Sequence, residues 1–155
     1  MKTQVKQIRP ILRQLVGLPL WSIGKAGSFL TWFAFGNNRR TVVRLNGKKK
    51  VVSEFSLHVQ CAWRIRSKNK IIIASSEDQE ENQFYRTVKT FLKHQNRRLI
   101  LVTGIKVDEI GNLSIALNHD SFLEVFPNSI GNTEFWRFFK PYSEEAHLFF
   151  TANGI

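Results

Sequence analysis

The feature that most constrains the fold is an unbroken alternation of apolar and other residues over residues 55–66. Every second residue from Phe55 to Ile65 is apolar. Successive side chains of a β-strand point to opposite faces, so this period of two predicts one strand with a buried face, which includes Cys61 and Trp63, and an exposed face. The polar members of the exposed face are Ser56, His58, Gln60, Arg64 and Arg66.

A β-hairpin is predicted directly before this strand. Asn46-Gly47 separates two short runs, residues 41–45 and 48–52. Asn-Gly is favoured in tight hairpin turns because both central positions of the turn take positive φ. A two-residue loop would place Arg44 opposite Lys49, where like charges are unfavourable unless solvent screens them or an anion lies between them.

Further strands follow from short apolar runs bounded by turn residues. The aromatic run at residues 28–35 predicts a strand that is buried on both faces or central in its sheet. Residues 71–74 would pair back onto the alternating strand. The remaining predicted strands are a meander at residues 99–107, 113–117 and 122–126, and one or two further segments at residues 134–139 and 147–151.

Two helices are predicted, one at the N-terminus and one near the middle of the chain. Residues 2–16 have apolar residues at helical spacing beside a basic face, and Pro10 is expected to start or kink this helix. The apolar residues are Val5, Ile8, Leu12 and Leu15. A second helix at about residues 77–95 would be capped by Ser76, with an acidic first turn and a basic end. Its apolar face would contain Phe84, Val88, Phe91 and Leu92.

These elements predict an α+β fold with a mostly antiparallel sheet of hairpins and a meander, because regular β-α-β alternation is missing. The charge of the chain is divided unevenly. Residues 1–70 contain 15 Lys and Arg against one acid, a net charge of +14, whereas residues 71–155 have a net charge of −3. No linker separates these halves, so we expect one domain over residues 1–155 with an uneven surface suited to an acidic partner.

Groups suited to catalysis or metal binding are few. Cys61 and His58 are predicted on opposite faces of one strand, so they cannot act as nucleophile and base. Asn118-His119-Asp120 is explained by a turn, and no His or Cys residues have the spacing of a metal site. The acids at residues 77–81 lack the pattern of a calcium loop, and phosphate-binding glycine loops are absent. We therefore predict no catalytic residue, no metal and no cofactor.

The cellular location is predicted from cysteine usage and hydropathy. A single cysteine cannot close an internal disulfide, which favours the reducing cytoplasm. No apolar run approaches the roughly 18 residues of a membrane span. The first 53 residues contain no acid, a bias shared with organelle transit peptides, but such peptides are rich in serine and this segment is not.

Several short motifs resemble a group of small, uncharacterised bacterial proteins. They are LHVQCAWRI at residues 57–65, LEVFPNS at 123–129, WRFF at 136–139 and HLFF at 147–150. The resemblance spans residues 17–155, and Ala62 stands where that group has proline. It implies no established activity, but these proteins are similar to the small standalone proteins that accompany bacterial toxin and conflict systems.

A basic binding patch is predicted on the exposed face of the alternating strand and the adjoining hairpin. Its members are Arg44, Lys48, Lys49, Lys50, His58, Gln60, Arg64 and Arg66. Arginine pairs suit phosphate and carboxylate equally well. Our first hypothesis is a non-enzymatic protein that binds an acidic protein, in its most concrete form an immunity-type protein that neutralises a toxin.

Two alternatives stay open. Nucleic-acid binding without sequence specificity needs exposed aromatic rings, and among Trp21, Trp32 and Trp63 only Trp21 is expected to be exposed. An enzyme acting on an anionic substrate would need a cleft that joins His58 or His119 to Arg64. The oligomeric state is not predicted.

Overall fold

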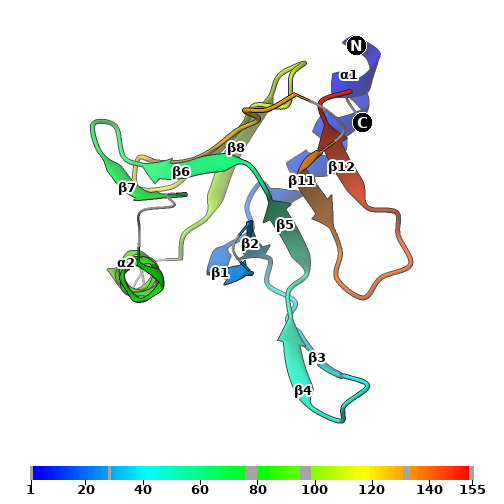
Figure 1. Cartoon of the computed structure of the whole chain (residues 1–155), viewed down its shortest axis with the longest axis vertical. Coiled ribbons are helices and arrows are strands. Elements are labelled where there is room, and N and C mark those ends of the chain that lie inside the picture. The colour runs from blue at the N-terminus through cyan, green and yellow to red at the C-terminus, as the bar shows by residue number, and fades with distance from the viewer. Residues whose placement is uncertain (1, 28, 76–79, 95–98, 131–132, 154–155) are drawn as a thin grey trace.

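Two five-stranded antiparallel sheets face each other in the computed structural model (Figure 1), which describes residues 2–27, 29–75, 80–94, 99–130 and 133–153. The first sheet contains, in spatial order, β1 (Leu20–Ala26), β2 (Leu30–Phe35), β5 (Phe55–Val59), β11 (Glu134–Phe139) and β12 (Leu148–Thr151). The second contains β7 (Ile71–Ala74), β6 (Ala62–Arg66), β10 (Ser121–Phe126), β9 (Leu113–Leu117) and β8 (Val102–Val107).

A separate hairpin and two helices complete the described fold. They are β3 (Arg40–Val43) with β4 (Lys49–Val52), α1 (Lys2–Leu12) with a short 3-10 turn η1 (Arg13–Leu15), and α2 (Glu81–His94). The predicted α+β class and antiparallel meander are confirmed. No helix in the described ranges is long and apolar enough to cross a membrane.

The predicted single strand over residues 55–66 is wrong. The chain bends at Gln60 and Cys61, so β5 pairs within the first sheet and β6 within the second. The apolar alternation continues across the bend, and Leu57 and Ile65 are both fully buried. This is possible because the two sheets share one core between their inner faces. The polar residues of β5 and β6 consequently lie on opposite outer faces of the molecule.

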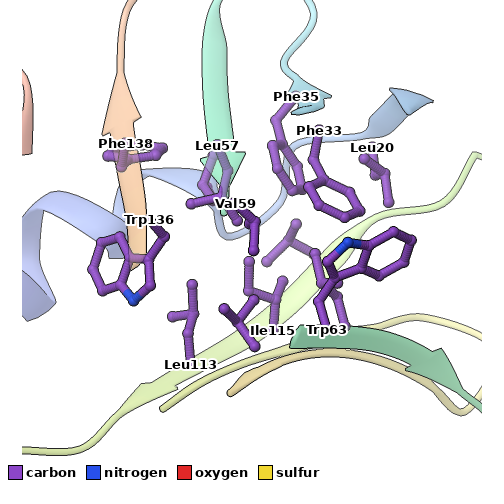
Figure 2. Packing of buried hydrophobic residues seen from close by; sticks show 14 of the residues in the cluster. Leu20, Phe33, Phe35, Leu57, Val59, Trp63, Leu113, Ile115, Trp136 and Phe138 are labelled. Carbon is purple, nitrogen blue, oxygen red and sulfur yellow. The ribbon is translucent and has the colours of Figure 1, made fainter. Parts of the chain in front are cut away.

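Aromatic and aliphatic side chains from both sheets pack together in the core between them (Figure 2). Phe33 from the first sheet meets Trp63 from the second edge to face, with ring centroids 4.9 Å apart. The Trp63 Nε1 group donates to Thr31 Oγ1 at 3.0 Å, so the buried indole has its hydrogen bond. Each such ring stabilises the fold by about 1.5–3 kcal/mol. The prediction that Trp63 is a core residue is confirmed.

The N-terminal helix α1 buries its predicted apolar face, and Ile8, Leu12 and Leu15 are fully buried. The expectation that Pro10 starts this helix is wrong, because α1 begins at Lys2 and contains Pro10. Proline removes one backbone hydrogen bond there, but burial of the apolar face offsets that loss. The helix gives way to the 3-10 turn three residues later.

The second helix begins later than predicted, at Glu81 rather than near residue 77. Its apolar face is confirmed, with Phe84 fully buried and Val88 and Phe91 almost so. The predicted cap Ser76, the acids at 77 and 78 and the basic residues at 97 and 98 lie outside the described residues.

The β3–β4 hairpin projects away from the two sheets (Figure 1). Its loop has three residues, not the predicted two, because Arg44 N donates to Lys48 O at 2.8 Å and Gly47 adopts a φ of +78°. A glycine with positive φ closes three-residue hairpin loops of this kind. Arg44 therefore lies opposite Lys48, whereas Lys49 pairs with Val43.

Candidate functional site

The groove between the hairpin and the outer face of the first sheet is the candidate site. It has a volume of about 530 Å³ and is open to solvent. Its floor contains Trp32 and His58, its hairpin wall contains Arg44 and Lys50, and the β11–β12 connection contributes Tyr142. We call it the hairpin groove.

The floor of the hairpin groove is set by the register of the first sheet. Gly24, Trp32, His58 and Arg137 pair across four neighbouring strands and share the outer face. A Cβ atom on Gly24 would lie 2.2 Å from the Trp32 ring. Glycine at this position lets the indole lie flat on the sheet, so Trp32 is half-buried and lines the groove.

The hairpin wall is held at its base by polar contacts. Arg40 donates from one guanidinium nitrogen to the carbonyl oxygens of Pro141 and Tyr142, at 2.8 and 2.7 Å. Next to it, the Arg39 guanidinium lies over the Trp21 ring at 3.9 Å from the ring centroid. These contacts fix the angle at which the hairpin leaves the sheet, although its far end is exposed.

Alternation along the hairpin separates its basic residues. Because Arg44 lies opposite Lys48 and Val42 opposite Lys50, the basic residues Arg44, Lys48 and Lys50 share one face, and Lys49 lies on the other. Within the described ranges, neither Arg44 nor Lys50 forms an ion pair. Their charges are available to an anion in the groove.

His58 lies half-buried among charged neighbours. Burial lowers its pKa from the usual 6.5, and the charges of Arg137 and Lys50 lower it further, against a smaller opposite effect of Glu134. The imidazole meets Phe139 edge to face at 4.7 Å, and Phe139 stacks on His147 at 4.4 Å. The groove therefore contains a chain of flat rings.

Arg137 connects these rings to a carboxylate. It makes two hydrogen bonds to Glu134, at 2.9 and 2.8 Å, which raise the pKa of the guanidinium. Its third contact is with Nδ1 of His147 at 3.2 Å. A guanidinium has no acceptor, so Nδ1 accepts this bond in the His147 tautomer that carries its proton on Nε2.

The predicted patch is not one surface. Arg44, Lys50 and His58 meet in the hairpin groove, Lys48 and Lys49 extend along the hairpin, and Gln60 is exposed at the bend after β5. Arg64 and Arg66 belong to β6 and lie on the outer face of the second sheet. The two faces are separated by the core, so no single ligand can contact His58 and Arg64 across a flat patch.

On the second sheet both arginines are already engaged. Arg64 Nε and Arg66 Nε donate to the same oxygen of Glu124, at 2.8 and 2.6 Å. Desolvation raises the pKa of Glu124, but the two hydrogen bonds and two positive charges outweigh it, and the net pKa is lowered. The guanidinium of Arg64 covers the Phe126 ring at 4.8 Å, and that of Arg66 covers the Phe122 ring at 4.5 Å.

The other reactive residues lie elsewhere. Cys61 packs against the core but is only partly buried, less than predicted, and burial raises the pKa of its thiol to about 12, so it is a poor nucleophile. His119 and Asp120 occupy a turn at positive φ, as expected from their residue types. The described residues contain no group of three or more His, Cys, Asp or Glu side chains that could hold a metal ion.

Sequence reasoning missed several residues of the groove. Trp32 was expected in a strand that is buried on both faces or central in its sheet, and Arg137, Phe139 and His147 were not predicted as site residues. A period-two pattern through the aromatic run would have placed Trp32 and Phe33 on opposite faces of the strand. The pairing of Trp32 with Gly24 was missed because residues 20–26 were not predicted as a strand.

Comparison with known protein families, with characterised proteins and with solved structures finds no match to this chain.

Proposed function

We propose that this protein binds single-stranded nucleic acid in the hairpin groove, without sequence specificity and without catalysing a reaction on it. The observation that carries the proposal is the combination of open rings, Trp32 and His58, with cations Arg44 and Lys50 in one groove. Proteins that bind single strands use this combination, because bases stack on aromatic rings and cations follow the phosphates. The proposed place of action is the cytoplasm.

The alternatives from the sequence have less support in this groove. A toxin-neutralising protein needs an acidic protein partner, whose carboxylates would pair with Arg44 and Lys50 and leave the stacking surfaces of Trp32 and His58 without a specific role. An enzyme of the expected kind needs His58 or His119 in a cleft with Arg64. In the described structure His58 shares its groove with Arg44 instead, and His119 is not among the residues that line this groove. Both alternatives stay untested hypotheses.

The proposal is tested by fluorescence polarisation with labelled oligo-dT of about 20 nucleotides, titrated at several salt concentrations. For a single strand, the slope of log affinity against log salt is about −0.7 for each phosphate neutralised. The double variant Arg44→Glu/Lys50→Glu is expected to lose about tenfold or more in affinity and to have a slope shallower by about 1.4.

The matched control is Lys68→Glu/Lys70→Glu. It changes the net charge by the same amount, and both lysines are exposed in the β6–β7 turn. We expect this variant to bind within about twofold to threefold of the wild type at about 100 mM salt. No binding by the wild type at about 50 mM salt would overturn the proposal. Equal losses in both double variants would show a general charge effect and exclude the groove as the site.

A further inference from the structure

A second concave surface lies on the outer face of the second sheet, on the opposite side of the molecule from the hairpin groove. It is a trough of about 560 Å³. Arg9 and Arg13 form one wall, Lys106 and Ser114 lie on the strands of its floor, and Glu124 and Phe126 form the other wall. We call it the α1 trough.

The charges that are open in the α1 trough are positive. Arg9 and Arg13 are exposed, as is Lys106, and none of the three takes part in an ion pair in the described part of the chain. The two carboxylates in the lining are already satisfied. Glu124 accepts from Arg64 and Arg66, as described above.

Asp108 is the other carboxylate, and its own turn supplies its hydrogen-bond donors. Its Oδ1 accepts from the backbone N–H groups of Ile110 and Asn112, at 3.1 and 2.9 Å, and its Oδ2 accepts from Asn112 Nδ2 at 2.8 Å. A ligand in the α1 trough therefore meets three free cations and two carboxylates that need no further partner.

We propose that the α1 trough binds an acidic segment of a partner protein in an extended conformation. Phe126 and Phe122 are covered by arginine guanidinium groups, so this face offers no open ring on which a base can stack. Without stacking, a nucleic acid would gain only phosphate contacts in the trough. A peptide carboxylate instead matches the guanidinium fork in two parallel hydrogen bonds.

The spacing of the two arginines specifies the peptide. Residues four apart on a helix surface have Cβ atoms about 5–6 Å apart. Alternate residues of an extended chain point to the same side and are about 6.5–7 Å apart. Arg9 and Arg13 therefore fit carboxylates on every second residue of an extended segment. The acidic protein partner expected from the sequence would bind here, independently of a nucleic acid in the hairpin groove.

The test uses the full chain and a fluorescein-labelled peptide in which Glu and Ser alternate over about eight residues, titrated by fluorescence polarisation at about 50 mM salt. Saturable binding is expected, and Arg9→Glu/Arg13→Glu should weaken it by about tenfold or more. Lys68→Glu/Lys70→Glu, with the same net charge, should stay within about twofold. Lys106→Glu is a second trough variant, on β8 rather than on the helix, and should weaken binding in the same direction.

The outcomes separate the two classes of ligand. No binding of the alternating peptide by the folded wild type overturns the inference, and so does equal weakening by the trough and control variants. If Arg9→Glu/Arg13→Glu weakens oligo-dT binding instead of peptide binding, the trough belongs to the nucleic-acid surface and the peptide proposal is wrong. The oligo-dT experiments with the hairpin variants are unaffected by any of these results.

Discussion

The outer faces of the two sheets contain the same residue types, aromatic rings and cations, in opposite arrangements. On the first sheet Trp32 lies flat over Gly24 and lines an open groove, and the cations come from the hairpin above it. On the second sheet each arginine lies over a phenylalanine of the neighbouring strand and both bind Glu124. A ring and a cation make a stacking site only when the cation does not already cover the ring.

The largest expected effect that separates the two faces comes from removing one ring on each. Trp32→Ala should weaken binding of oligo-dT by about 5- to 150-fold, since stacking of one base contributes about 1–3 kcal/mol. Phe122→Ala removes a ring that Arg66 already covers, so oligo-dT affinity should change by less than about twofold. Both are measured by fluorescence polarisation after thermal unfolding shows that each variant is folded.

Gly24→Ala gives an independent control, because it keeps every aromatic ring. The added Cβ would lie 2.2 Å from the Trp32 ring, so the indole must move off the sheet. Affinity should fall in the same direction as for Trp32→Ala. Equal losses in Trp32→Ala and Phe122→Ala would contradict the distinction between open and covered rings.

The next largest effect is expected at Glu124, the carboxylate that binds Arg64 and Arg66 on the outer face of the second sheet. Glu124→Gln replaces two charge-assisted hydrogen bonds, and a free energy of unfolding lower by about 1–2 kcal/mol is expected in urea at neutral pH, after allowance for the partial exposure of both arginines. The control Glu134→Gln affects one arginine, Arg137, and should lose less. A larger loss in Glu134→Gln would show that the shared carboxylate on the second sheet has no special role.

The stability difference between the wild type and Glu124→Gln is expected to depend on pH. Because the folded pKa of Glu124 is lowered from its usual 4.5, its contribution to stability is complete above pH 4.5 and is lost as the pH falls through the lowered folded value. The stability difference between wild type and Glu124→Gln should therefore shrink in acid. Urea unfolding repeated at decreasing pH measures it.

The smallest effect is expected at His58. Its folded pKa lies below 6.5, so the unfolded chain takes up a proton first and stability falls as the pH decreases below 6.5. His58→Gln should lose less stability than the wild type between about pH 7.5 and pH 5.5, as measured by urea unfolding. Histidines elsewhere in the chain contribute equally to both proteins. Identical pH profiles would contradict the effect of burial and of the neighbouring Arg137 and Lys50.

Local patterns in the sequence were sufficient for most of the fold. The Asn-Gly signal placed the hairpin, and short apolar runs placed the meander and the last two strands, because turn residues and strand periodicity act over a few neighbours. The loop length of the hairpin was wrong by one residue. Asn46-Gly47 is compatible with both a two-residue and a three-residue loop, and Gly47 supplies the positive φ in either case.

Local patterns in the sequence predicted only part of the candidate site. Arg44, Lys50 and His58 were selected from charge and alternation, and they do line one groove. Arg64 and Arg66 were grouped with them because residues 55–66 looked like one strand. Trp32 was not selected, since its exposure depends on Gly24, a cross-strand partner that only the pairing of β1 with β2 reveals.

What the sequence by itself determined is which side chains face the core, because alternation is a local property that persists even through the bend at Gln60 and Cys61. What only the tertiary structure decided is on which side of the molecule each polar residue lies. The bend carries the chain from one sheet to the other, and a shared core then separates His58 from Arg64. An alternation with a period of two indicates which side chains of a strand face the core and which face outward. It contains no information about which of two facing sheets the strand joins.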